Sequence, residues 1–186
     1  MNIPEIFKYN SIISIPLFSI ISLLLIRKAP AFSFRKHTVS MSILLFNRPT
    51  QTLIFRLNFV IKGLLDLGFV WFILHYFKIS FESPTAWVLI LSALLFLSLA
   101  YFIEGKYTIT HKVIAYSSGV FWAIGQIHLA KLIGDVSFIQ LTNIAVVIPL
   151  VLAFGFMFVK KTNVFIQVLC MSIWYIWLVL FVFTYL

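Results

Sequence analysis

Residues 52–77 read TLIFRLNFVIKGLLDLGFVWFILHYF, an apolar stretch long enough to cross a bilayer, which takes about 20 residues of helix. Asn58, Lys62 and Asp66 interrupt the stretch at a spacing of four, so they lie along one face of the predicted helix. A charged side chain in hydrocarbon needs a partner or water. Lys62 and Asp66 are one turn apart and can pair with each other, or the face can line a polar cavity. Both interpretations are open.

Composition extends the membrane interpretation to the whole chain. Hydrophobic residues make up 62% of the sequence and charged residues 10%, with a mean hydropathy of +1.09. A soluble domain is about half apolar and about a quarter charged. The length of 186 residues leaves room for one transmembrane domain and no separate soluble domain. We therefore predict an all-α integral membrane protein.

Six apolar segments are long enough to span a membrane, and the short links between the later ones predict an antiparallel bundle. The predicted spans are about 10–26, 52–77, 85–103, 112–133, 140–159 and 164–186.

The first connection is the long one. Its middle part, HTVSMSILLF at residues 37–46, is too short to span and too apolar to sit in water, so we expect it to lie in the interface or to re-enter the bundle. Pro30 and Pro49 bracket the segment and favour extended or turn geometry before each proline. This loop should therefore fold separately from the helices that flank it.

The net charge of +9 comes from basic residues that lie mostly between the apolar runs. A nucleic-acid-binding protein would gather them into one solvated patch, so we expect membrane lipids and no nucleic acid as partners. The first, third and fifth connections carry more Lys and Arg, including Lys160 and Lys161. The positive-inside rule then places loop one in the cytoplasm of a prokaryotic inner membrane, with both termini outside. An anionic ligand of loop one would explain the same residues.

Motifs for metal, cofactor or covalent chemistry are absent from the sequence. Cys170 is the single cysteine, and the histidines and carboxylates are not clustered at ligand spacing. We therefore predict no metal, no cofactor and no assigned catalytic residue. A membrane-protein partner or a homo-oligomer is compatible with the sequence.

Polar residues from three parts of the chain should meet at the loop-one side of the membrane. Glu104 ends the third predicted span, His111 precedes the fourth, and Arg35, Ser40 and Arg48 lie in loop one. Such a group could hold a phosphate headgroup or perform acid and base chemistry. His111 could equally be an interfacial residue beside a capped helix start. Arg56, about 120° around its helix from Lys62, is expected to reach the nearby surface.

The loop segment with Thr38 and Ser40, the run FNRPTQTLIFRLNFVIKGLL and the segment THKVIAYSSG together resemble the bacterial and archaeal membrane family called domain of unknown function 998. That family is similar to the eukaryotic DRAM and Sfk-type six-helix proteins. Asn58, Gly63 and His111 match family positions, whereas Met41 stands where the family has an acidic residue. The resemblance implies a six-helix fold and a role connected with lipids.

Three functions are compatible with these residues. In the first, a polar pocket between loop one, the second span and the start of the fourth binds a lipid headgroup or a small amphiphile. Its tentative ligand-binding residues are Arg35, Ser40, Arg48, Asn58, Lys62, Asp66, Glu104 and His111. In the second, His111 and Glu104 serve a lipid-modifying enzyme. In the third, the chain is a structural or accessory subunit, which a dry and mutually satisfied Lys62–Asp66 pair would favour.

Overall fold

The computed structural model describes residues 4–158 and 163–186, and within them the chain is helical and contains no strand. The all-α prediction is confirmed for this part of the chain. The elements are η1 (Glu5–Tyr9), α1 (Asn10–Ile26), η2 (Ser40–Leu45), α2 (Pro49–Tyr76), α3 (Pro84–Ser98), α4 (Thr108–Ile133), α5 (Val136–Phe158) and α6 (Val164–Tyr185).

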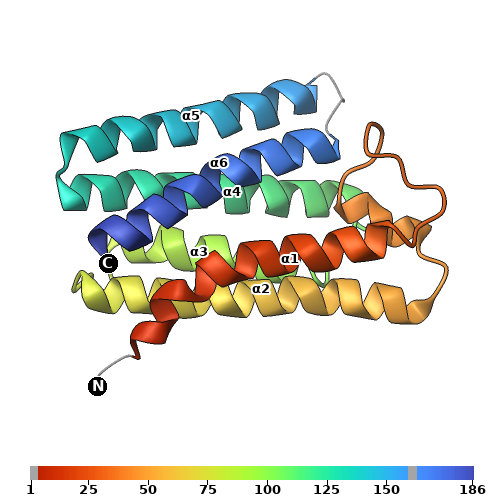
Figure 1. Cartoon of the computed structure of the whole chain (residues 1–186), viewed down its shortest axis with the longest axis horizontal. Coiled ribbons are helices and arrows are strands. Elements are labelled where there is room, and N and C mark those ends of the chain that lie inside the picture. The colour runs from red at the N-terminus through yellow and green to blue at the C-terminus, as the bar shows by residue number, and fades with distance from the viewer. Residues whose placement is uncertain (1–3, 159–162) are drawn as a thin grey trace.

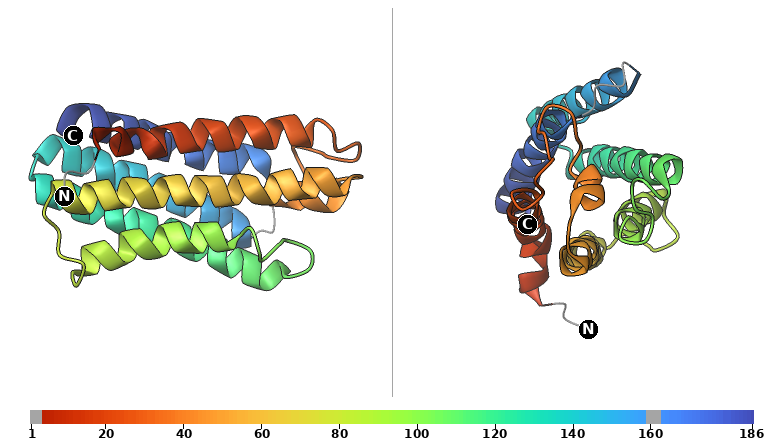
Figure 2. Two further views of the ribbon diagram at one scale, coloured as in Figure 1. Left: turned by 90° about the horizontal axis from the view of Figure 1, so that it is seen from below. Right: turned by 90° about the vertical axis from the view of Figure 1, so that its right-hand side faces the viewer.

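The six α-helices run along one common axis (Figure 1). Each packs against its neighbour in the sequence, and α6 also contacts α1. Helix η1 and the end of α6 lie at the end of the bundle opposite loop one (Figure 1). The bundle therefore has two different ends, and loop one covers part of one of them (Figure 2).

Five of the helical segments are long and apolar enough to cross a membrane, which indicates an integral membrane protein. They are Glu5–Ile26, Pro49–Tyr76, Thr108–Ile133, Val136–Phe156 and Val164–Tyr185.

The third predicted span, 85–103, extends too far, because α3 ends at Ser98. A helix of 15 residues is about 22 Å long, short of a hydrocarbon core of about 30 Å. The backbone N–H groups of Leu99, Ala100 and Tyr101 bond three residues back, which tightens the chain into turns. Hydropathy suggested a longer helix because these turn residues are themselves apolar.

Other helix ends also move relative to the predicted spans. Helix α2 starts at Pro49, where proline suits the first helical position because it lacks an N–H. Helix α4 starts at Thr108, so His111 lies inside its first turn. The end of the span predicted at 140–159, and the basic residues Lys160 and Lys161, lie outside the described residues.

Loop one packs back on the bundle. Ser42 in η2 is fully buried, and the loop is tied to the start of α6. The Val164 N–H donates to the His37 carbonyl at 3.0 Å, and the Val39 N–H donates to Gln167 Oε1 at 2.8 Å. Loop one therefore takes its position from the last helix of the chain.

A cluster of phenylalanine rings fills the interior beneath loop one. The Phe59 ring lies edge-on to Phe55 and Phe18, with centroids 5.2 and 5.0 Å apart, and tilted against Phe96 at 5.4 Å. Offset and edge-to-face contacts of this kind are favourable for aromatic rings. Loop one packs against this cluster through Ile43.

Candidate functional site

Glu104 is the centre of a polar cluster that loop one closes. It lies in the turns after α3 and is only 5% exposed. Its Oε2 atom accepts hydrogen bonds from Thr38 Oγ1 at 2.9 Å and from Ser40 Oγ. Both hydroxyls come from loop one. The Glu104 carboxylate therefore joins loop one to the connection between α3 and α4. Hydrogen bonds to a carboxylate are stronger than those between neutral groups.

His111 lies beside this carboxylate with its orientation fixed by the backbone. Its Nδ1 atom is 2.6 Å from the Phe102 carbonyl oxygen, so Nδ1 carries a hydrogen and donates it. Its Nε2 atom then faces Glu104 Oε2 at 4.0 Å, which is too long for a hydrogen bond. The imidazole is 5% exposed. The fold therefore brings together Glu104 and His111, the two titratable residues that the sequence analysis placed at the loop-one side of the membrane.

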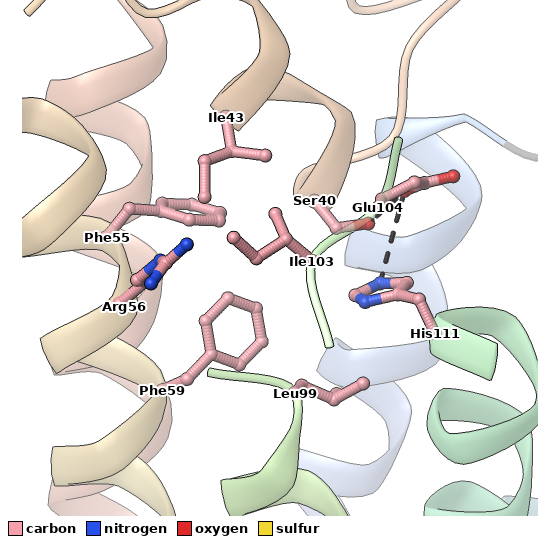
Figure 3. A pocket seen from close by; sticks show the side chains of 9 residues that line it. All are labelled: Ser40, Ile43, Phe55, Arg56, Phe59, Leu99, Ile103, Glu104 and His111. Atoms are coloured by element: carbon pink, nitrogen blue, oxygen red, sulfur yellow. Dashed lines mark hydrogen bonds and ion pairs between the residues drawn. The ribbon is translucent and has the colours of Figure 1, made fainter. Parts of the chain in front are cut away.

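A small cavity of about 10 Å³ adjoins this pair. That volume has room for about one water molecule. Figure 3 shows Arg56, Phe55 and Phe59 on one side of the cavity and Ser40, Glu104 and His111 on the other. The full lining is Ser40, Ile43, Phe55, Arg56, Phe59, Leu99, Ile103, Glu104 and His111.

Arg56 lines this cavity. Its side chain is also exposed, and this exposure is what the sequence predicted. Arg35 and Arg48, the predicted anion-binding residues, are exposed and do not line the cavity. Arg48 precedes the first turn of α2, where its backbone N–H donates to Gln51 Oε1 at 3.1 Å. The one arginine at the cavity comes from the helix and not from the loop.

Lys62 and Asp66 form an ion pair in the interface between α1 and α2. Asp66 Oδ1 also accepts from Ser14 Oγ at 2.7 Å and from Ser11 Oγ at 3.0 Å. The ammonium group of Lys62 lies 4.4 Å from the centre of the Phe96 ring, a favourable distance for a cation above an aromatic face. Neither charged residue lines the cavity near His111.

Asn58 continues this polar row along α2. Its Nδ2 atom donates to the Phe18 carbonyl at 2.9 Å and to Ser22 Oγ at 3.1 Å. Asn58 does not line the cavity either. Of the two interpretations of this face, the geometry favours a Lys62–Asp66 pair that satisfies itself, within a row that joins α1 to α2. The Oδ1 atom of Asn58 has no hydrogen-bond partner among the described residues. The accessory-subunit hypothesis remains compatible with that arrangement.

The sequence analysis gave no role at the site to four residues that build it. Thr38 donates a hydrogen bond to Glu104, Phe55 and Phe59 line the cavity, and Gln167 holds loop one. Thr38 could have been found, because it lies two residues before Ser40 in the same motif. The aromatic residues gave no signal among the 21 phenylalanines of the chain. Gln167 is far from loop one in the sequence, so only folding reveals that contact.

A larger groove of about 450 Å³ lies along α4, with Phe154 of α5 on its other side. It is open and mainly apolar, and Lys112, Tyr116 and Ser117 supply its polar atoms. The groove offers an apolar surface but no converging buried polar groups. We therefore assign the candidate site to the smaller cavity.

No family model, curated protein or solved structure matches this chain. The described residues also contain no group of three His, Cys, Asp or Glu residues arranged to hold a metal ion. A relationship to domain of unknown function 998 remains a hypothesis based on the sequence motifs. Inferences about function must come from the geometry of the site itself.

Proposed function

We propose that this membrane protein binds the polar headgroup of a membrane lipid at the loop-one end of its helical bundle. The observation that carries the proposal is the buried pair of Glu104 and His111 beside a cavity that Arg56 also lines. Burying ionisable groups in a membrane protein is costly, so such groups usually serve a function or have a partner. Here a ligand is the partner that we propose.

Arg56 takes the role that the sequence assigned to Arg35 and Arg48. A guanidinium group binds a phosphate through two parallel hydrogen bonds. Arg56 is the arginine at the cavity, and its exposed side chain can meet a lipid that approaches from outside. Ser40 and His111, both tentative ligand-binding residues in the sequence analysis, would orient the headgroup, and Thr38 holds Glu104 in place.

The size of the cavity sets the manner of binding. A volume of about 10 Å³ admits one small group and not a whole headgroup. The headgroup phosphate would therefore stay outside the cavity, beside the exposed side chain of Arg56. The acyl chains would remain in the bilayer.

The test compares lipid retention by matched arginine variants. Wild type, Arg56→Gln and Arg48→Gln are released from nanodiscs of mixed phospholipids, and bound lipid is counted by native mass spectrometry. Losing a hydrogen bond to a charged group should lower retention about tenfold in Arg56→Gln. Arg48→Gln removes a similar exposed charge outside the cavity and should match wild type. Unchanged retention by Arg56→Gln would refute headgroup binding at this site.

A second candidate is a lipid-modifying enzyme that uses Glu104 and His111 as base and acid. The 4.0 Å separation of their facing atoms, beside a shared cavity, favours it. Purified protein incubated with phospholipid mixtures should then produce new lipid species in mass spectra, and His111→Gln should abolish them. Identical lipid profiles with and without the wild-type protein would eliminate this candidate.

A further inference from the structure

The open groove between α4 and α5 follows one face of α4. Its α4 residues recur at spacings of three and four, as residues on one helical face do, and they are Ile109, Lys112, Val113, Tyr116, Ser117, Val120 and Phe121. Phe154 of α5 stacks on the Tyr116 ring, with centroids 5.7 Å apart. The groove volume of about 450 Å³ is within the range of ligand sites. The groove shares no lining residue with the cavity beside Glu104 and His111.

The length of the groove matches the depth of one lipid leaflet. The groove starts at the loop-one end of the bundle, where α4 begins (Figure 1). From Ile109 to Phe121 it extends about 18 Å along the helix. Half of a hydrocarbon core of about 30 Å is about 15 Å. The groove therefore runs from the headgroup layer toward the middle of the bilayer, which is the depth that a phospholipid acyl chain occupies.

The chemical groups of the groove follow a definite order along α4. Lys112 is exposed near the loop-one end, where its ammonium group can reach the headgroup layer. The hydroxyls of Tyr116 and Ser117 come about one turn deeper, and Val120 and Phe121 follow with carbon alone. A glycerophospholipid has a matching order, namely an anionic phosphate, ester oxygens that accept hydrogen bonds, and an acyl chain. The groove is therefore complementary to such a lipid.

The polar side chains of the groove have no partner within the part of the chain that the structure describes. Ser118, the next residue, exchanges hydrogen bonds of 3.0 and 2.9 Å with Ser92 of α3. The hydroxyls of Tyr116 and Ser117 make no such bond to residues 4–158 or 163–186, and Lys112 forms no ion pair with them. A hydroxyl in hydrocarbon without a hydrogen bond is costly. An acceptor from outside the chain would stabilise these groups.

We propose that this groove binds a glycerophospholipid of net negative charge. One acyl chain lies along Val120 and Phe121, the ester groups accept hydrogen bonds from Tyr116 and Ser117, and the phosphate pairs with Lys112. A zwitterionic lipid carries a cation beside its phosphate, which reduces its attraction to Lys112. The site lies on another face of α4 from His111 and is independent of the headgroup function proposed above.

A second copy of the chain would complement Lys112 less well than a lipid does. Of the five acidic residues of the chain, the exposed ones are Glu5, Glu82 and Asp135, and they lie at the end of the bundle opposite loop one. Glu104 lies at the loop-one end but is buried. A copy with the same orientation in the membrane therefore brings no exposed carboxylate to the level of Lys112.

The test maps photoactivatable lipids on the full-length protein in nanodiscs. Phosphatidylglycerol and phosphatidylcholine probes carry the same diazirine-bearing acyl chain, and mass spectrometry of peptides locates the adducts after irradiation. A diazirine near the ester should label α4 around Tyr116 and Ser117, and one near the chain end should label it around Val120 and Phe121. Labelling should be about fivefold stronger with phosphatidylglycerol, as expected for one interfacial lysine.

Two pairs of variants separate the charge from the groove. Lys112→Gln should remove the preference for phosphatidylglycerol, whereas Lys131→Gln, an exposed change at the other end of α4, should keep it. Val120→Trp places a bulky ring in the groove and should abolish the deeper adducts of both probes. Val147→Trp changes an exposed valine of α5 outside the groove and should leave them. If Val120→Trp lost its cooperative thermal unfolding, the two probes on wild type would decide alone.

Three results would overturn the proposal. The first is equal labelling of α4 by both probes, and the second is the same adduct positions for both diazirine depths, since ordinary boundary lipid would produce either. The third is crosslinking between two copies of the protein through the groove without lipid adducts, which would assign the groove to a second copy. Arg56→Gln should leave labelling of the groove unchanged, so failure of headgroup binding at Arg56 is scored separately.

Discussion

The backbone N–H of Val164 donates a hydrogen bond to the carbonyl oxygen of His37, with 3.0 Å between nitrogen and oxygen. This bond joins the first residue of α6 to loop one. It satisfies an N–H at a helix start that has no partner within the helix. The last helix of the chain thereby fixes the loop that supplies Thr38 and Ser40 to Glu104.

Gln167→Ala should loosen loop one, because Gln167 Oε1 accepts the Val39 N–H at 2.8 Å. Loss of one such hydrogen bond costs about 1 kcal/mol. Amide hydrogen exchange, followed by mass spectrometry, should speed up in peptides covering 37–46 and stay constant in α2. Gln140→Ala, an exposed change on α5, is the matched control. Unaltered exchange in loop one would show that this contact does not hold it.

Lys62→Met should destabilise the bundle more than the double variant Lys62→Met with Asp66→Leu. The side chains of Lys62 and Asp66 are 10% and 17% exposed, and removing one partner of a buried pair costs about 3–5 kcal/mol because the other charge is left uncompensated. Unfolding in mixed micelles of increasing dodecyl sulfate measures the difference. Strictly additive losses would contradict a coupled pair.

Gly63→Ala should separate α2 from α3. A Cβ atom on Gly63 would lie 2.6 Å from Leu97 Cβ and 2.9 Å from Leu97 Cα, and overpacking of this kind costs about 1–3 kcal/mol. Gly155→Ala is the control, because its Cβ would meet no atom within 4 Å and alanine favours a helix by about 0.5–1 kcal/mol. Thermal unfolding in detergent should rank Gly63→Ala below wild type, and the reverse order would refute the close approach.

Acid should weaken the start of α5 through Asp135. Hydrogen bonds from the Phe138 N–H at 3.0 Å and the Tyr185 hydroxyl at 2.9 Å hold the pKa of Asp135 below its ordinary value of 3.8. A lowered pKa in the folded state stabilises the fold above pH 3.8, and the stabilisation is lost as the pH falls through the folded-state pKa. The Tm of wild type should therefore drop in that window.

The matched variants for this effect are Asp135→Asn and Glu82→Gln. Asparagine can still accept from the Phe138 N–H but does not titrate, so its Tm should fall less in acid. Glu82 is an exposed acid in the link before α3, and its replacement should keep the wild-type profile. Parallel pH profiles for wild type and Asp135→Asn would rule out the role of this carboxylate.

The membrane class and the helical fold follow from the sequence, because apolar length and composition are properties of each segment alone. The pairing of Lys62 with Asp66 could also be predicted, since both lie on one helix, one turn apart. The end of α3 could not be predicted, because Leu99 and Tyr101 are as apolar as the helix before them. Hydropathy does not distinguish an apolar turn from an apolar helix.

The sequence by itself determined that Glu104, His111 and Ser40 belong to one end of the bundle, because chain direction alternates between successive spans. Only the tertiary structure decided that Arg56 lines their cavity while Arg35 and Arg48 stay outside it. It also decided that Asn58 and Asp66 bond to α1, while Lys62 lies against Phe96 of α3. The physical reason is the rotation of each helix about its own axis. The sequence fixes which residues share a helical face, but packing between helices fixes what that face contacts.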